Sequence, residues 1–131
     1  MNNSANPLYR EAVAAREKAL ALYSGFRVGA ALQCEDGTIF TGCNIESASY
    51  GLTICAERTA LFKALSDGKK TFSRILVVAD TRELTAPCGA CRQVLWDFAP
   101  RIEVTIANLE GDQKTFQMKD LFPNPFGSHL F

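Results

Sequence analysis

Three cysteines at the predicted starts of two helices constrain this chain more than any other feature. Cys55 opens the segment Thr53–Lys63, whose apolar residues recur at helical spacing, and Cys88 and Cys91 open a second helical pattern after Pro87. Free N–H groups and a partial positive charge at a helix N-terminus lower the pKa of a thiol there and favour cation binding. We therefore expect two helix starts to meet and to bring three thiolates together.

The number of thiols at motif spacing indicates a catalytic metal site. A structural zinc site takes four protein ligands, whereas a catalytic one takes three and leaves a position open. Cys34 and Cys43 lie in strand-like segments without a Cys-x-x-Cys or His-x-x-x-His neighbour, and we interpret them as small buried residues. The only histidine, His129, lies in the tail, which argues against a histidine-based nucleophilic mechanism. The pattern predicts one Zn²⁺ per chain.

Glu57 and Arg58 follow Cys55 and have predicted roles beside the metal. Glu57 is roughly 200° around the helix from Cys55, but side chains tilt toward the helix N-terminus, so both can lean past its tip. A carboxylate there can take a proton from metal-activated water. Arg58 can donate to the sulfurs and offset the net negative charge of three thiolates on Zn²⁺. Without the cysteines, the helix dipole would explain Glu57 and a surface ion pair would explain Arg58.

Length and charge limit the possible organisation and partners. With 131 residues and 47% hydrophobic content, we expect one domain over residues 1–131. Lysine plus arginine and aspartate plus glutamate balance at 14 each, so the basic excess typical of polynucleotide binding is missing. A small-molecule substrate is therefore expected.

Three further features bear on location. No apolar run approaches the roughly 20 residues of a membrane span. The polar start Met1–Ser4 does not have the pattern of a signal peptide. Five cysteines, an odd number, fit thiolate ligands in a reducing cytoplasm better than a disulfide framework.

The hydrophobic pattern alternates between helical and strand-like segments. Predicted helices run from Asn6-Pro7 to Ser24-Gly25, from Cys55 to Asp67, from Pro87 to Pro100, and over Met118–Phe122. Predicted strands are Phe26–Cys34, Thr38–Asn44, Ile75–Ala79, Ile102–Ala107 and Lys114–Gln117, and Ile45–Ile54 is a predicted loop that delivers side chains to the site.

Connections between these segments predict the topology. Asp36-Gly37 indicates an antiparallel hairpin of the first two strands. The continuous apolar run Ile75–Ala79 is typical of a central strand buried on both faces. Asn108–Gln113 is too short for a parallel crossover, so the fifth strand must be antiparallel to the fourth. Apolar residues of the tail, from Phe122 to Phe131, predict burial at a subunit interface.

Several motifs together resemble those of one enzyme family. They are Phe26–Ala31, Gly42–Glu46, Cys55-Ala56-Glu57-Arg58, Pro87-Cys88-Gly89-Ala90-Cys91-Arg92-Gln93 and Phe126. On these residues the chain resembles the small homotetrameric cytidine deaminases that act on free nucleosides. The resemblance implies an α/β fold, a three-layer α-β-α sandwich around a mixed five-stranded sheet. It also implies active sites that are shared between subunits.

The resemblance implies a role for each matching residue. Zinc would be bound by Cys55, Cys88 and Cys91, and Arg58 would offset the charge of these thiolates. Glu57 would shuttle protons and, with the Ala56 backbone, would recognise the base edge. Phe26 would pack on the pyrimidine, and Asn44 and Glu46 would hold the ribose hydroxyl. Ala48 and Tyr50 match positions used across a subunit boundary, and Phe126 matches an aromatic that closes over a neighbour's base; loop filling and tail packing are their alternatives. Arg92 and Gln93 fit either a place beside the metal ligands or a solvated helix face.

The implied reaction is zinc-dependent hydrolytic deamination of cytidine and deoxycytidine, with release of ammonia, in pyrimidine salvage. A blasticidin-type deaminase of a modified nucleoside would share the zinc motif. A tRNA or DNA deaminase is disfavoured by the neutral charge and the antiparallel fifth strand. A non-catalytic zinc module is the alternative from another class, although it needs neither an open metal position nor an adjacent carboxylate.

Overall fold

A mixed five-stranded sheet with strand order β2-β1-β3-β4-β5 forms the centre of the computed structural model, which describes residues 6–131. β3 and β4 are parallel, and the other neighbouring pairs are antiparallel. The predicted mixed sheet, its central third strand and its antiparallel fifth strand are confirmed. The strands are β1 (Val28–Cys34), β2 (Ile39–Cys43), β3 (Phe72–Ala79), β4 (Glu103–Ala107) and β5 (Gln113–Gln117).

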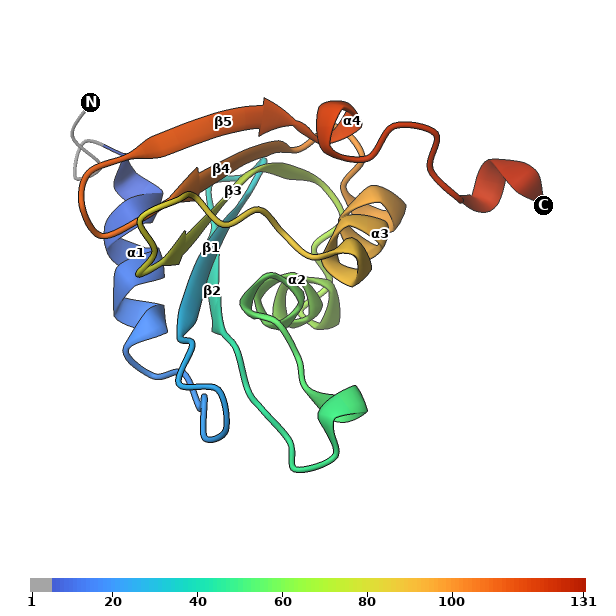
Figure 1. Ribbon diagram of the computed structural model, residues 1–131. Coiled ribbons are helices and arrows are strands. Elements are labelled where there is room, and N and C mark those ends of the chain that lie inside the picture. The colour runs from blue at the N-terminus through green and yellow to red at the C-terminus, as the bar shows by residue number, and fades with distance from the viewer. Residues whose placement is uncertain (1–5) are drawn as a thin grey trace.

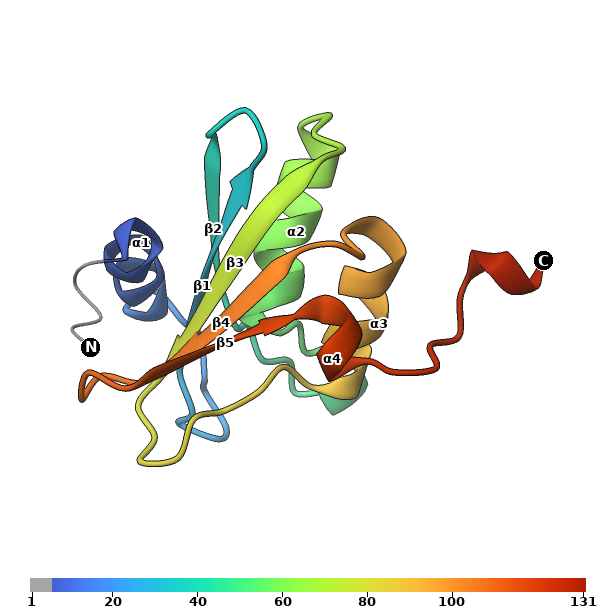
Figure 2. The ribbon, with the colours of Figure 1, turned by 90° about the horizontal axis from the view of Figure 1, so that it is seen from above.

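Helices cover both faces of the sheet. α1 (Pro7–Arg16) lies on one face, and α2 (Ala56–Ser66) and α3 (Gly89–Phe98) lie on the other (Figure 1). The view from above shows the same separation into layers (Figure 2). This arrangement is the predicted three-layer sandwich. The short elements are the 3-10 helix η2 (Tyr50–Leu52), α4 (Met118–Leu121) and the 3-10 helix η3 (Ser128–Leu130).

The core consists of two apolar clusters, one on each side of the sheet. In β3, Ile75 and Val77 belong to the cluster under α2 and α3, whereas Leu76 and Val78 belong to the cluster under α1. Successive side chains of a strand point to opposite faces, so a strand covered on both sides must be apolar at every position. This explains the uninterrupted apolar run in β3.

Two glycines let the helices approach the sheet closely. A Cβ atom on Gly29 of β1 would clash with the Ala12 carbonyl oxygen of α1. A Cβ atom on Gly42 of β2 would lie 2.5 Å from both the Ala56 carbonyl oxygen and the Ala60 nitrogen of α2. Backbone atoms cannot move aside as a flexible side chain can. Gly42 therefore fixes the first turns of α2 against the sheet.

The first helix is shorter than predicted. Asn6 caps it as expected, because its Oδ1 accepts a hydrogen bond from the Leu8 N–H at 2.9 Å. The prediction that it reaches Ser24-Gly25 is wrong, since α1 ends at Arg16. The Leu20 backbone pairs instead with Asn44 and Glu46, through N···O distances of 3.0 and 2.9 Å. These long-range hydrogen bonds replace the local ones that a longer helix would have made.

The C-terminal tail extends away from the sheet beyond α3 and α4 (Figure 2). Its aromatic side chains remain largely accessible, with 60% of Phe126 and 94% of Phe131 exposed. No helix within residues 6–131 is both long and apolar enough to cross a membrane. The prediction made for Met1–Ser4 concerns residues outside the described range.

Candidate active site

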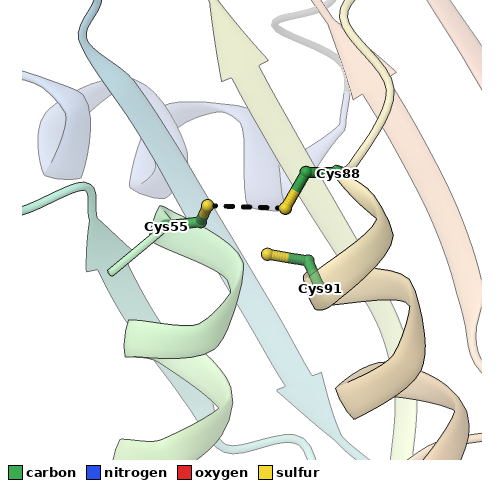
Figure 3. Close-up of side chains that lie close together, drawn as sticks. All are labelled: Cys55, Cys88 and Cys91. Atoms are coloured by element: carbon green, nitrogen blue, oxygen red, sulfur yellow. Dashed lines mark hydrogen bonds between the residues drawn. The ribbon is translucent and has the colours of Figure 1, made fainter. Parts of the chain in front are cut away.

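The three predicted thiols meet where the first turns of α2 and α3 converge. Cys55 is the N-cap of α2 and Cys88 the N-cap of α3, and neither side chain hydrogen-bonds to its own helix as a cap. Cys91 lies in the first turn of α3 and is fully buried. All three side chains point toward a common centre (Figure 3).

Distances among the sulfur atoms suit a single metal ion. The Cys55 and Cys88 Sγ atoms are 3.6 Å apart, and the three Sγ atoms lie within 4.8 Å of one another. Tetrahedral zinc with Zn–S bonds of about 2.3 Å separates its sulfur ligands by about 3.8 Å. Within the described residues, no other group of three or more histidine, cysteine or acidic side chains could hold an ion. The donor set therefore fits Zn²⁺ with one position left for water or substrate.

Hydrogen bonds and burial shift the pKa values of Cys55 and Cys91 in opposite directions. Hydrogen bonding from Cys91, assisted by Arg58, lowers the pKa of Cys55 to about 5. The same interaction with Cys55, together with burial, raises the pKa of Cys91. Arg58 Nη2 donates to Cys55 Sγ at 3.6 Å and to the Thr53 carbonyl oxygen at 3.4 Å. These contacts favour the thiolate form of Cys55, which is the form that binds a metal ion.

Glu57 lies at the inner wall of the cavity beside these thiols. It is only 5% exposed, and burial raises the pKa of its carboxyl group to about 7. Charged carboxylates are seldom buried unless they are paired or have a chemical task. The sequence predicted Glu57 beside a metal held by these thiols, and Glu57 lines the same cavity as Cys55 and Cys88.

A cavity of about 160 Å³ opens onto Glu57 and two of the thiols. Predicted residues in its wall are Phe26, Asn44, Cys55, Ala56, Glu57 and Cys88, and the others are Val28, Thr53, Val77, Ala79, Thr85 and Ala86. The residues of this second group were not predicted as site residues from the sequence. Thr85 and Ala86 could have been found because they directly precede Pro87-Cys88, whereas Val77 and Ala79 belong to an apolar strand and carry no sign of facing a site.

Asn44 connects the cavity wall to the start of β1. Its Oδ1 accepts from the Val28 N–H at 2.8 Å, and its Nδ2 donates to the Phe26 carbonyl oxygen at 2.7 Å. Both polar ends of this buried amide therefore hold the backbone that carries the Phe26 ring. Each end also keeps one further hydrogen-bonding position for a ligand.

Other predicted residues lie away from the cavity. Glu46 is turned toward the backbone of Tyr23 and Ser24, and Ala48 and Tyr50 are exposed. Gln93 donates to the Phe126 carbonyl oxygen at 2.9 Å, so it joins α3 to the tail. Arg92 donates to the carbonyl oxygens of Pro87 and Leu121, both at 2.8 Å, and thus fixes the start of α3.

Known proteins resemble this chain over most of its length. A family described as the cytidine and deoxycytidylate deaminase zinc-binding region matches residues 2–107. Cytidine deaminase from Halalkalibacterium halodurans is 52% identical over 120 residues, covering 91% of each chain. The crystal structure of cytidine deaminase from Burkholderia pseudomallei superposes with a TM-score of 0.90 at 51% identity, covering 96% of this chain and 100% of that one.

A relative with a different name is more distant. Blasticidin-S deaminase from Bacillus cereus is 32% identical over 119 residues, covering 83% of this chain and 84% of its own. The three-thiol centre, the adjacent buried carboxylate, the sheet and the matching relatives agree. The chain belongs to the cytidine and deoxycytidylate deaminase family.

Proposed function

We propose that this protein hydrolyses the C4 amino group of cytidine and deoxycytidine, yielding uridine or deoxyuridine and ammonia. The observation that carries the proposal is the buried carboxyl group of Glu57 in the wall of a cavity beside three converging thiols. A non-catalytic zinc module has no need for such a cavity or carboxyl group. The high identity to cytidine deaminases supports the same conclusion.

Cys55, Cys88 and Cys91 would hold the zinc ion, which supplies a water molecule of lowered pKa as the nucleophile. Glu57 takes a proton from this water and delivers it to N3 of the cytosine ring. The water oxygen would bond to C4, and Glu57 would pass the second water proton to the amino nitrogen. The C4–N4 bond would then break, so that ammonia leaves and a C4 carbonyl remains. Arg58 reduces the charge on the sulfurs through its contact with Cys55.

The remaining predicted residues have binding roles in this proposal. Phe26 packs on the pyrimidine, Asn44 and Glu46 hold the ribose hydroxyl, and the Ala56 backbone reads the base edge. Ala48, Tyr50 and Phe126 complete sites of neighbouring subunits in a homotetramer. Gln93 contributes indirectly by holding the Phe126 segment. Residues 1–131 form one cytidine deaminase-like domain in this proposal, and its free thiols suit the reducing cytoplasm.

Ammonia release from cytidine by the zinc-loaded protein tests the reaction. Glu57→Gln keeps the shape of the side chain but cannot accept the proton, so kcat should fall by about 10²–10⁴-fold. Zinc content should stay at one per chain. Glu103→Gln serves as the control and should leave kcat unchanged. Glu103 lies opposite Arg74 in the β3–β4 register, at the end of these strands that is away from the cavity.

The possible results of these assays distinguish the candidate functions. A fully active Glu57→Gln protein would refute the proton-transfer role. A folded, zinc-loaded native protein that releases ammonia only from blasticidin S would favour the modified nucleoside as substrate. Absence of turnover with either compound would leave the non-catalytic zinc module.

A further inference from the structure

A tight turn between α1 and β1 grips the carboxylate of Glu46. The N–H groups of Tyr23 and Ser24 both donate to Glu46 Oε1, at 2.9 and 3.0 Å. The Ser24 hydroxyl donates to Glu46 Oε2. Gly25 closes the turn with φ of +71°, a conformation that glycine adopts without strain. Three donors from two consecutive residues therefore set the direction of one carboxylate.

The Ser24 hydroxyl also connects Glu46 to Phe26, the residue proposed to pack on the pyrimidine base. Its oxygen accepts a hydrogen bond from the Phe26 N–H at 2.9 Å. An ionised carboxylate can only accept, so the Ser24 proton must point to Glu46 and its lone pairs to Phe26. These hydrogen bonds also lower the pKa of Glu46, with the Ser24 hydroxyl as the largest cause. Glu46, Ser24 and Phe26 thus form one directed chain of hydrogen bonds.

This chain of hydrogen bonds spans two adjoining hollows. The first is the cavity described above, whose lining includes Phe26, Asn44 and Glu57. The second, of about 380 Å³, is lined by Tyr23, Ser24, Glu46, Tyr50 and Thr53. Thr53 lines both, so they meet at this residue. Glu46 Oε2 keeps an acceptor position after Ser24 has donated to it. A sugar hydroxyl in the second hollow can use that position while the base occupies the first.

We propose that Ser24 is a positioning residue for nucleoside recognition: its hydroxyl aims the Glu46 carboxylate at the sugar and ties it to the backbone of Phe26. The inference rests on the proposed deamination of nucleosides. It assigns a role to a residue that would touch neither the metal nor the reacting atoms. Loss of the Ser24 hydroxyl should therefore weaken substrate binding more than the chemical step.

Steady-state kinetics of Ser24→Ala, Ser24→Thr and Ser73→Ala test the assignment. Hydrogen bonds to charged groups are the stronger ones, so Ser24→Ala should raise KM for cytidine about tenfold with kcat changed less than about twofold. Ser24→Thr keeps the hydroxyl and should restore KM. Ser73→Ala is the matched control, because the Ser73 hydroxyl donates to the Gln33 carbonyl oxygen at the far end of the β1–β3 pair, and it should behave as the native protein.

A second substrate separates positioning from general stability. 2′,3′-Dideoxycytidine lacks the 2′- and 3′-hydroxyls of the sugar. If Glu46 holds the 3′-hydroxyl, the binding constant of this compound, measured as substrate or competitive inhibitor, should change less than about threefold in Ser24→Ala. An equal loss for both nucleosides, or no change for cytidine, would overturn the inference while native turnover leaves the proposed function intact. Absence of native turnover would instead overturn the proposed function.

Discussion

Single side chains at this site are set by their immediate surroundings. Cys55 and Cys88 occupy corresponding N-cap positions on different helices, and Glu57 is buried one turn or less from the first of them. Helix starts and cysteine spacing are local, so the sequence was sufficient to predict these residues. The hydrogen bond of Ser24 with Glu46 joins residues that are 22 positions apart in the chain, and nothing in the sequence near Ser24 indicates it.

Substitution of buried cysteines distinguishes metal ligands from core residues. Cys91→Ala should abolish stoichiometric zinc binding, because two thiols cannot replace a three-thiol site. Cys34→Ala is the matched control, since Cys34 is 2% exposed and packs in the apolar core. It should keep one zinc per chain, measured by atomic absorption. Full zinc content in Cys91→Ala would contradict the assigned ligand set.

At the scale of elements, α2 depends on its contact with the β1–β2 hairpin. The sequence predicted both elements from their apolar patterns and from Asp36-Gly37, but Gly42 gave no local sign that a helix lies against it. The first helix was predicted too long for the same reason, because its end depends on contacts with residues far away in the sequence. Residues 17–25 fit a helical period, yet the Leu20 backbone pairs with Asn44 and Glu46, a partner choice that only the assembled fold reveals.

A methyl group at Gly42 should loosen α2 from the sheet. The added Cβ would lie 2.5 Å from two backbone atoms of α2, so Gly42→Ala should lower the free energy of unfolding by about 1–3 kcal/mol or more. Urea denaturation measures this loss. Gly51→Ala is the control, because no atom lies within 4 Å of its added Cβ. Equal midpoints for the two variants would contradict the packing argument.

At the scale of the whole molecule, the C-terminal tail leaves large apolar side chains exposed to water. Phe126 and Phe131 contact each other edge to face with centroids 5.8 Å apart, and both remain largely accessible. The sequence predicted that this tail is too apolar to remain in water. In the proposed homotetramer a neighbouring subunit would receive the tail, and such a contact has no local pattern in the sequence of one chain.

Mixing two defective chains tests whether subunits complete one another. A chain that ends at Pro125 lacks Phe126 and should bind cytidine weakly, while Glu57→Gln keeps the tail but lacks the proton acceptor. In the proposed homotetramer, mixed assemblies would place an intact tail over an intact Glu57, so joint refolding should restore activity beyond the sum of the separate proteins. Purely additive activity, or unchanged kinetics of the truncated chain, would count against shared sites.

The convergence of the thiols from two helices has a topological consequence. Cys55 and Cys88 are 33 residues apart, and all of β3 lies between them. An ion bound to both closes this stretch into a loop, much as a disulfide would, and a covalent link over a loop of such length contributes about 3–4 kcal/mol by restricting the unfolded chain. Unlike a disulfide, this link can be removed without a reductant, and its contribution grows with free zinc concentration. An ion bound at this site would therefore have two roles: it would supply the nucleophile, and it would act as a reversible cross-link that stabilises the fold.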